Sequence, residues 1–278
     1  MRLLLPLLVT LGCSHATRAT RAPAAGEPVL EVLTYNVNFG IPGDAATVGV
    51  LESSTAGLVL LQETTPQWQS ASSQRLSLKW PHQTWLHAPG AGGLAVLSRS
   101  PFEVKDVLKN PAGWFPSMRV VAQTPLGPVQ ALIVHLRPPV SDSGSWVSGY
   151  LTTGPARRAE VEHFLGSLDP SLPTLIAGDF NEGTGGEAVR ELERRKLRSV
   201  LPEFAPDAKT WGWDVGALHL SAQLDHIVYS THLEPLTARV VAGGRSDHQA
   251  VMAVFARSGQ QDLVTPTPRG GSLSFSLR

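Results

Sequence analysis

Side chains that could do chemistry recur where apolar runs of this sequence end. In the stretch LIAGDFNEGTGG, residues 175–186, a short apolar run leads directly to Asp179 and Asn181 and then to glycines. Burying a carboxylate is costly unless it is paired or holds a metal ion. We therefore expect Asp179 either to cap a turn or to belong to a functional site.

Further apolar runs are interrupted in the same way. The interrupting residues are Asn36 in VLTYNVN, Glu63 after LVLLQ, His135 in ALIVHLRPP, Asp225 in QLDHIVYS, and Asp247 with His248 in SDHQAVMAVF. Each one alone has an ordinary explanation, such as a satisfied core amide, a structural histidine or an Asx turn. Together they favour one chemistry, because carboxylates and amides are ligands for Mg²⁺ or Mn²⁺ and histidines transfer protons.

The elements that must position these residues are mostly strands. We predict strands, each apolar and bounded by turn residues, over 29–37, 57–62, 93–98, 119–123, 129–136, 174–177, 226–229 and 251–255. The spacing of apolar residues predicts helices over 155–168, 185–197 and 47–56. Several strands are joined by connections too short for a crossover helix, which favours mixed sheets over a purely parallel one.

In order and character, the same residues resemble the endonuclease/exonuclease/phosphatase superfamily, which includes deoxyribonucleases and neutral sphingomyelinases. The matching blocks, from Val29 to Phe255, are TYNVN, LLQET, GGLAVLSR, VHLRP, GDFN, LDHIVYS and SDHQAV. Asp-Phe-Asn together with a late Ser-Asp-His is a specific pattern. The resemblance implies a four-layer α/β sandwich, in which two mixed sheets pack face to face, helices cover the outer faces, and the site lies at one end.

The resemblance also implies roles for the residues that would bind the metal ion and for those that would contact the attacking water. Glu63 would be the main ligand of Mg²⁺ or Mn²⁺, with Asn36 beside it and Asp247 near the metal. Asp179 would position or deprotonate the attacking water, and Asn181 would hydrogen-bond the phosphate or that water. The implied reaction is metal-dependent hydrolysis of a phosphodiester, or of a phosphomonoester, by an activated water.

The proton-transferring residues follow from the same resemblance. Asp225 would fix the tautomer of His248 and favour its charged form. His135 would protonate the leaving group or bind a phosphate oxygen. The sequence offers no evident carboxylate to orient His135, and its single cysteine excludes the disulfide-bearing loop of secreted deoxyribonucleases.

The net charge of the chain does not identify its substrate. Residues 27–258 carry 18 lysines and arginines against 22 aspartates and glutamates, a net charge of −4. This charge does not indicate a protein that binds nucleic acid by electrostatic attraction alone. We expect a monomeric, nuclease-like hydrolase. The alternatives are a phospholipid or sphingomyelin phosphodiesterase, acting on a phospholipid head group, and a non-catalytic binding module of the same fold.

Substrate choice is expected to lie in the loops. The long segment 138–155, rich in Gly and Ser, contains two aromatic residues and leads into a helix start that favours anions. The aromatic residues could stack a base, enter lipid or pack under a loop. The substrate-binding candidates are Arg119, Trp146, Tyr150 and Arg157.

The chain ends carry a separate prediction. Residues 1–13, MRLLLPLLVTLGC, read as a secretory signal, and Cys13 after TLG resembles the lipidated cysteine of bacterial lipoproteins. A plain signal peptide is the alternative. We expect an exported protein, anchored by Cys13 or else periplasmic or secreted, with a tether over 14–28, the catalytic domain over 29–257 and a disordered tail over 258–278.

Overall fold

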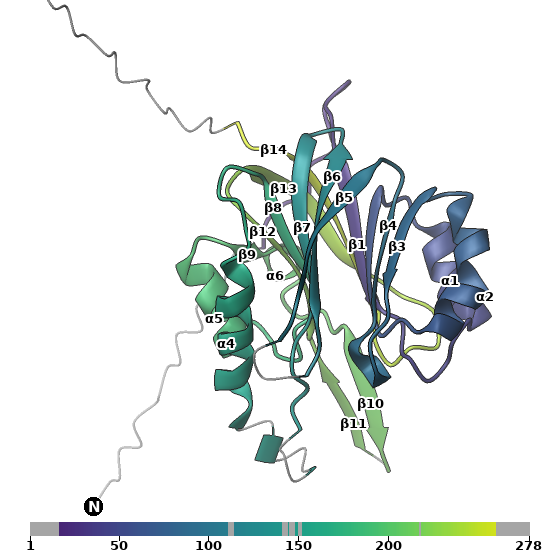
Figure 1. Cartoon of the computed structure of the whole chain (residues 1–278). Helices are drawn as coiled ribbons and strands as arrows, with labels where there is room; N and C mark the ends of the chain where they lie inside the picture. The colour runs from purple at the N-terminus through teal and green to yellow at the C-terminus, as the bar shows by residue number, and fades with distance from the viewer. Residues whose placement is uncertain are drawn as a thin grey trace, which may run out of the picture.

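Two sheets packed face to face form the body of the molecule. The computed structural model describes residues 17–259, except 111–113, 141–143, 145–147, 150–151 and 217. Each large sheet has six strands, in the orders β13-β14-β1-β2-β4-β3 and β5-β6-β7-β8-β12-β9. Helices α1 and α2 lie outside the first sheet, and α4 and α5 lie outside the second (Figure 1). The predicted α/β sandwich of two mixed β-sheets is confirmed.

The first sheet mixes parallel and antiparallel pairs. Strand β1 runs parallel to β2 and antiparallel to β14. The strands of this sheet are β1 (Leu30–Asn36), β2 (Leu58–Gln62), β3 (His82–Leu86), β4 (Leu94–Ser98), β13 (Leu233–Val241) and β14 (Ala250–Arg257). Its helices are α1 (Ala45–Ser53) and α2 (Pro66–Ser77), with a 3₁₀ turn, η1 (Gly90–Gly92), before β4.

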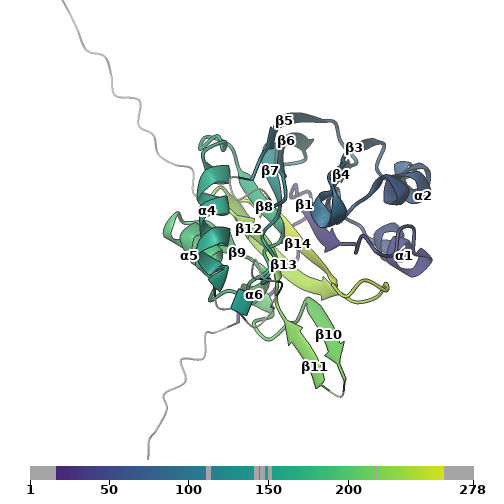
Figure 2. The same cartoon turned by 60° about the horizontal axis from the view of Figure 1, so that its bottom comes forward.

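The second sheet repeats this plan. Strand β7 runs parallel to β8, which pairs antiparallel with β12. The strands are β5 (Phe102–Leu108), β6 (Ser117–Thr124), β7 (Gly127–His135), β8 (Thr174–Asp179), β9 (Arg198–Ser199) and β12 (Asp225–Tyr229). The helices are α4 (Gly154–Leu165), α5 (Glu187–Arg194) and the short α6 (Leu201–Phe204). A separate ribbon, β10 (Trp211–Val215) and β11 (Leu218–Ala222), stands apart from both sheets (Figure 2).

Burial on both faces explains why the central strands read as continuous apolar runs. Alternate residues of a strand point to opposite faces. In β1, Val32 packs in the core between the sheets, whereas Leu33 packs under the helices of its own sheet. In β7, Ile133 and Leu132 divide in the same way.

Every strand and helix predicted from the sequence is present, but the more polar elements had not been predicted. Helix α2 has a weak apolar stripe, and it begins because Thr65 accepts a hydrogen bond from Trp68 N with Pro66 in the first turn. Strand β5 is an edge strand with mostly exposed side chains. Neither pattern is distinctive, so only the packing of the sheets reveals these elements.

The structure differs from the prediction of a free tether over 14–28. The described part, residues 17–28, lies along the domain. Arg18 donates its backbone N–H to the Glu203 carbonyl at 2.7 Å, and its side chain pairs with Glu203 and Glu234. The packed domain therefore begins before residue 29.

The remaining predictions for the chain ends concern residues outside the described part. The signal over 1–13, with Cys13, lies outside it, as does nearly all of the tail over 258–278. In the described part of the chain, no helix is long and apolar enough to cross a membrane.

Candidate active site

Strand direction brings the polar interruptions to one end of the sandwich. In the first sheet the parallel strands β1 and β2 end side by side, with Asn36 opposite Gln62. In the second sheet β7 and β8 end together, with His135 opposite Asp179, and β12 begins there with Asp225 opposite Asp179. Residues far apart in the sequence therefore meet because the carboxyl ends of parallel strands share an edge.

Asn36 joins the two sheets at this end. Its side chain is fully buried, and Nδ2 donates to Glu63 Oε1 at 2.9 Å and to Asp179 Oδ2 at 3.1 Å. Glu63 follows β2 in the first sheet, and Asp179 ends β8 in the second. The Asn36 amide is therefore satisfied by the carboxylates of both sheets, which fixes their spacing.

Asp225 and His248 form a buried pair. His248 Nδ1 lies 2.8 Å from Asp225 Oδ2, so the Nδ1–H donates to the carboxylate. The other ring nitrogen, Nε2, lies 3.5 Å from Asp179 Oδ2. Asp225 is fully buried and His248 is 5% exposed. The pair thus points one proton-bearing nitrogen towards Asp179 while the other is held by Asp225.

Electrostatics favours the charged form of this histidine. Burial alone would lower the pKa of His248, but the negative charges of Asp225 and Asp179 outweigh burial and raise that pKa above its usual range. Complete burial raises the pKa of Asp225, and the positive charge of His248 opposes this rise. The pair therefore retains a proton between its members around neutral pH.

His135 approaches the same carboxylate from β7. Its Nε2 lies 3.5 Å from Asp179 Oδ2 and 4.0 Å from Glu63 Oε1. Its Nδ1 lies 3.0 Å from the carbonyl oxygen of Ala91 in η1, to which it donates. The Phe115 ring stacks on the imidazole with centroids 4.4 Å apart. A backbone carbonyl and an aromatic ring thus orient His135, where the sequence offered no orienting carboxylate.

The loop after β8 is strained, and its sequence reflects the strain. Asn181 has a φ of 53°; its Nδ2 donates to the Leu136 carbonyl at 3.0 Å, and its N–H donates to Asp179 Oδ1 at 2.8 Å. Gly178 has a φ of 150°, and a Cβ there would lie 1.8 Å from the Val134 carbonyl oxygen. Glycine is therefore required in the GDFN stretch by the close approach of β7.

Asp247 is held by residues that the sequence did not single out. Its Oδ1 accepts from Asn38 Nδ2 at 2.8 Å, and its Oδ2 accepts from Trp211 Nε1 at 3.1 Å. Next to it, the Ser246 hydroxyl donates to the Asn36 carbonyl at 2.7 Å. The NFG turn at Asn38 is a weak signal of such a role, whereas nothing in the sequence marks Trp211.

The donor set fits a divalent cation. Glu63 accepts hydrogen bonds from Asn36 Nδ2 and from the Phe39 N–H, and 15% of its side chain remains exposed. Among the residues that the structure describes, no lysine or arginine pairs with the clustered carboxylates of Glu63, Asp179, Asp225 and Asp247. In the described part of the chain, the ion pairs of these carboxylates are with His135 and His248, so a cation with a preference for oxygen ligands fits the cluster.

A second metal-binding trio overlaps the histidine pair. Asp179, Asp225 and His248 offer ligand atoms within 4.8 Å of one another and could hold a metal ion. The 2.8 Å hydrogen bond already occupies Asp225 Oδ2 and His248 Nδ1, however. The partly exposed Glu63 is therefore the better position for a cation that must also reach a substrate.

The two predicted substrate-binding residues that the structure describes, Arg119 and Arg157, are engaged in ion pairs within the fold. Arg157 is 4% exposed and its guanidinium donates to Glu182 Oε2 at 2.8 Å, so it supports the fold and is not available to bind a substrate anion. Arg119 pairs with Asp106 and reaches towards Gln130, which lies at the far end of β7 from His135. Trp146 and Tyr150 lie outside the described residues.

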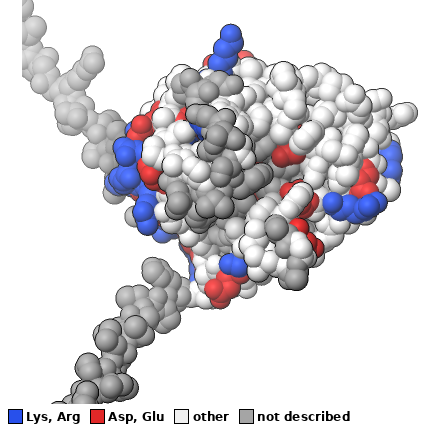
Figure 3. Space-filling view, turned by 90° about the horizontal axis from the view of Figure 1, so that it is seen from below, with Lys and Arg blue, Asp and Glu red and all other residues white. Residues whose placement is uncertain are grey.

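The surface at this end carries little positive charge. Figure 3 shows aspartates and glutamates scattered across the visible face, with lysines and arginines mostly at its margins. This distribution agrees with the net negative charge of residues 27–258. The described residues at this end therefore offer few cationic contacts to a long polyanion.

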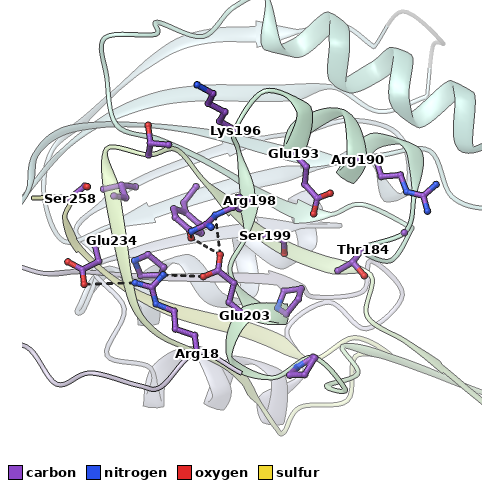
Figure 4. Close-up of a pocket in the computed structure, with 17 residues that line it drawn as sticks. Arg18, Thr184, Arg190, Glu193, Lys196, Arg198, Ser199, Glu203, Glu234 and Ser258 are labelled. Carbon is purple, nitrogen blue, oxygen red and sulfur yellow. Dashed lines mark hydrogen bonds and ion pairs between the residues drawn. The ribbon is translucent and has the colours of Figure 1, made fainter. Parts of the chain in front are cut away.

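A separate groove lies elsewhere and contains none of the predicted site residues. It is lined by charged side chains that include Arg18, Arg198, Glu203 and Glu234 (Figure 4). Arg18 and Arg198 lie 3.2 and 3.4 Å from Glu203, so these charges largely offset one another. The groove offers no arrangement of acids and bases comparable to the strand-end cluster.

A family model matches most of the chain. Residues 33–248 match the model of the endonuclease/exonuclease/phosphatase family, a span that begins in β1 and ends at His248. A search of curated proteins found no match.

Solved structures share the fold at low sequence identity. An endonuclease/exonuclease/phosphatase from Beutenbergia cavernae DSM 12333 matches with a TM-score of 0.64 and 18% identity, over 84% of this chain and 72% of that chain. TDP2 from Caenorhabditis elegans matches with a TM-score of 0.63 and 15% identity, over 84% and 77%. D. rerio TDP2 complexed with single strand DNA product matches with a TM-score of 0.61 and 14% identity, over 82% and 98%.

Proposed function

Because this chain belongs to the endonuclease/exonuclease/phosphatase family, it is a hydrolase of phosphate esters, and we propose that it cleaves phosphodiesters with Mg²⁺ or Mn²⁺. The observation that carries the proposal is the position of Asp179 Oδ2, which lies 3.5 Å from a ring nitrogen of each of two histidines. A carboxylate between two imidazoles can accept a proton from water, while one imidazole donates a hydrogen bond to a phosphoryl oxygen and the other, when both of its nitrogens carry a proton, gives one proton to the leaving oxygen.

Glu63, with Asn36 beside it, would hold the metal ion. A bound divalent cation supplies positive charge that stabilises the phosphoryl oxygens as the ester is cleaved. Asp247 contributes indirectly: the side chains of Asn38 and Trp211 hold its carboxylate within the loop before β14. Its role is to hold the loop that presents His248.

The protein's own residues carry the proton transfers. Asp179 orients the attacking water and accepts its proton, while the Asn181 N–H keeps the carboxylate in place. His248, charged because of Asp225, donates from Nε2 to a phosphoryl oxygen. His135, fixed through Nδ1, protonates the leaving oxygen from Nε2. Each donor has one nitrogen tied to the protein and the other directed towards Asp179.

The first substrate class to test is nucleic acid. The match to TDP2 complexed with single strand DNA product supports a nuclease-like activity. The sparse positive charge at the site end favours short or single-stranded ends over long duplexes. The second candidate, a phospholipid phosphodiesterase, is favoured by exposed apolar side chains near the site, among them Trp213 and Leu218.

Three assays on the purified full chain test this proposal. Hydrolysis of bis-p-nitrophenyl phosphate should stop with EDTA and return with Mg²⁺ or Mn²⁺; Glu63→Gln should lose this recovery, whereas Glu103→Gln, an exposed carboxylate on edge strand β5, should retain it. Nicking of plasmid DNA and release of phosphocholine from vesicles separate the two substrate classes. Absence of hydrolysis in all three assays would indicate a binding module, and full activity in EDTA would exclude the metal.

We further propose that the protein is exported and held at a membrane through Cys13. The sequence of residues 1–13 supports this location.

A further inference from the structure

The ribbon of β10 and β11 projects from the end of the sandwich that contains the site (Figures 1 and 2). Its strands pair with each other and with neither large sheet. An isolated two-stranded ribbon is marginally stable on its own, so something must hold its base or cover its faces.

The base of the ribbon is built into the active site. The Thr210 hydroxyl, just before β10, accepts hydrogen bonds from the N–H groups of Leu224 and Asp225 at 2.9 and 3.0 Å. Trp211 donates to the Asp247 carboxylate, and the Gly212 N–H donates to the Asp247 carbonyl at 3.0 Å. The ribbon is therefore fixed to both segments that present the Asp225–His248 pair.

One face of the ribbon is apolar and exposed. Directly paired residues of antiparallel strands point to the same face. Trp213 pairs with Leu220, and Leu218 lies two residues before Leu220, so all three share one face; they are 52%, 41% and 60% exposed respectively. The other face has the paired residues Asp214 and His219. The ribbon is thus amphipathic, with its apolar side unburied.

Other exposed aromatic residues surround the same site. Phe39 is 47% exposed and its N–H donates to Glu63 Oε2. Trp114 is 37% exposed and its ring contacts Phe115, which stacks on His135. Apolar side chains from three separate segments therefore rim the carboxylate–histidine cluster.

We propose that this apolar rim, with the ribbon as its main element, docks on the surface of a zwitterionic lipid bilayer. The inference rests on the proposed phosphodiesterase function for its consequence, since docking would present lipid head groups to His248 and Asp179. Trp213, Leu218 and Leu220 would enter the interfacial region, where tryptophan and leucine are favoured.

The exposed apolar area of the ribbon and its lack of positive charge favour a lipid surface over a protein or nucleic-acid partner. Three large side chains that are each about half exposed offer on the order of 300 Å², given ~150–250 Å² for a full aromatic side chain, which is well below the ~800 Å² per partner of a stable protein interface. Residues 211–222 include no lysine or arginine, so the ribbon suits neither nucleic acid nor a strongly anionic membrane.

Binding is tested on the full chain with vesicles of phosphatidylcholine, and the measurement requires no catalysis. Brominated phosphatidylcholine should quench tryptophan fluorescence, and Trp213→Phe should remove most of the quenched signal. Trp85→Phe on β3, a half-buried tryptophan of the opposite sheet edge, is the matched control and should keep the quenching. This readout reports the ribbon itself, whatever the chain's first residues contribute to binding.

A second pair of variants measures affinity. Leu218→Ser with Leu220→Ser should lower the vesicle partition coefficient at least about tenfold, because the apolar area that enters lipid is lost. Leu78→Ser, which changes a 91% exposed leucine after α2, should leave it unchanged. Sedimentation equilibrium and binding of a single-stranded oligonucleotide are measured on the same proteins.

Four results would overturn the proposal. The first three are unchanged quenching in Trp213→Phe, unchanged partition in the double leucine variant, and a wild-type dimer that becomes a monomer when the leucines are replaced. Oligonucleotide binding lost with the leucines would likewise assign the face to nucleic acid. If the wild-type protein binds vesicles but hydrolyses no phosphoester, the proposed phosphodiesterase function is refuted, whereas the proposed docking surface is supported.

Discussion

Replacing Asp225 by asparagine should separate the shape of the site from its charge. The side chain keeps its size at a fully buried position, and its amide oxygen can still accept from His248 Nδ1, now 2.8 Å from Asp225 Oδ2. The negative charge that holds His248 in its charged form is lost. We therefore expect a folded protein whose His248 has a lower pKa than in the wild type.

The expected size follows from the geometry. At an effective dielectric constant of ~20, unit charges ~4 Å apart interact by about 4 kcal/mol, which corresponds to about three pKa units. The nearby charge of Asp179 remains, so part of the raised pKa of His248 survives. Since the charged imidazole is the active form, activity persists below the pKa of His248 and is lost above it. The alkaline limb of the rate profile should therefore move to lower pH in Asp225→Asn.

Turnover of bis-p-nitrophenyl phosphate across pH measures this effect. His248→Ala should lose about 10²–10⁴-fold, the usual contribution of a general acid or base, and Asp225→Asn should lose as much at a pH above its lowered His248 pKa. The double variant should lose little more, because residues that act as one unit are not additive. Asp214→Asn is the matched control, since Asp214 lies 2.7 Å from His219 in an exposed pair on the ribbon.

Thermal melts decide whether the loss is chemical. Melting temperatures near that of the wild type, with lost turnover, would support the pair. If the single variants keep their turnover, if their losses multiply, or if the alkaline limb stays in place, then Asp225 and His248 act independently and the reasoning is wrong.

The remaining predictions concern stability and location. Gly178→Ala should prevent folding or strongly lower the melting temperature, because its Cβ would lie 1.8 Å from a carbonyl oxygen. In the control Gly49→Ala, in α1, the added Cβ meets nothing within 4 Å and should stabilise the helix. Equal melting temperatures of the two variants would contradict the close approach at Gly178. Burial lowers the pKa of His226 to about 4, so below its usual value of 6.5 the unfolded chain binds a proton that the native protein does not. Unfolding free energy should then fall by about 3 kcal/mol between pH 6.5 and pH 4, and urea titrations of His226→Gln should lack that component. Cys13→Ala should move the protein from the membrane fraction to the soluble fraction without changing its hydrolysis of a soluble ester; unchanged fractionation would refute the tether.

The functional residues at the ends of apolar runs were predictable because the free-energy cost of burying a polar side chain depends on its local sequence. A carboxylate such as Asp179 or Asp225 next to a buried strand requires a partner, whichever fold surrounds it. The central strands were predictable for a related reason, since they are buried on both faces and read as continuous apolar runs. The edge strand β5 and helix α2 lack such patterns and were missed.

Arg157 and Arg119 illustrate where sequence reasoning failed. An arginine near a helix start is equally consistent with an anion site and with a buried ion pair, and only the position of Glu182 decided for the pair. Arg119 was assigned to a substrate loop, but the register of β6 directs it towards Asp106 and Gln130. The identity of a long charged side chain does not specify which of several partners it reaches.

The sequence alone determined which chemically active side chains are present and which strands are continuously apolar. Tertiary structure decided which atoms face one another, because strands from both sheets had to meet before Asp179 could lie between His135 and His248. It also decided that Ala91 orients His135, that Trp211 holds Asp247, and that the face with Trp213 stays exposed. These contacts join residues distant in the chain, and a local pattern records the cost of burying a group but not the identity of the distant partner that offsets it.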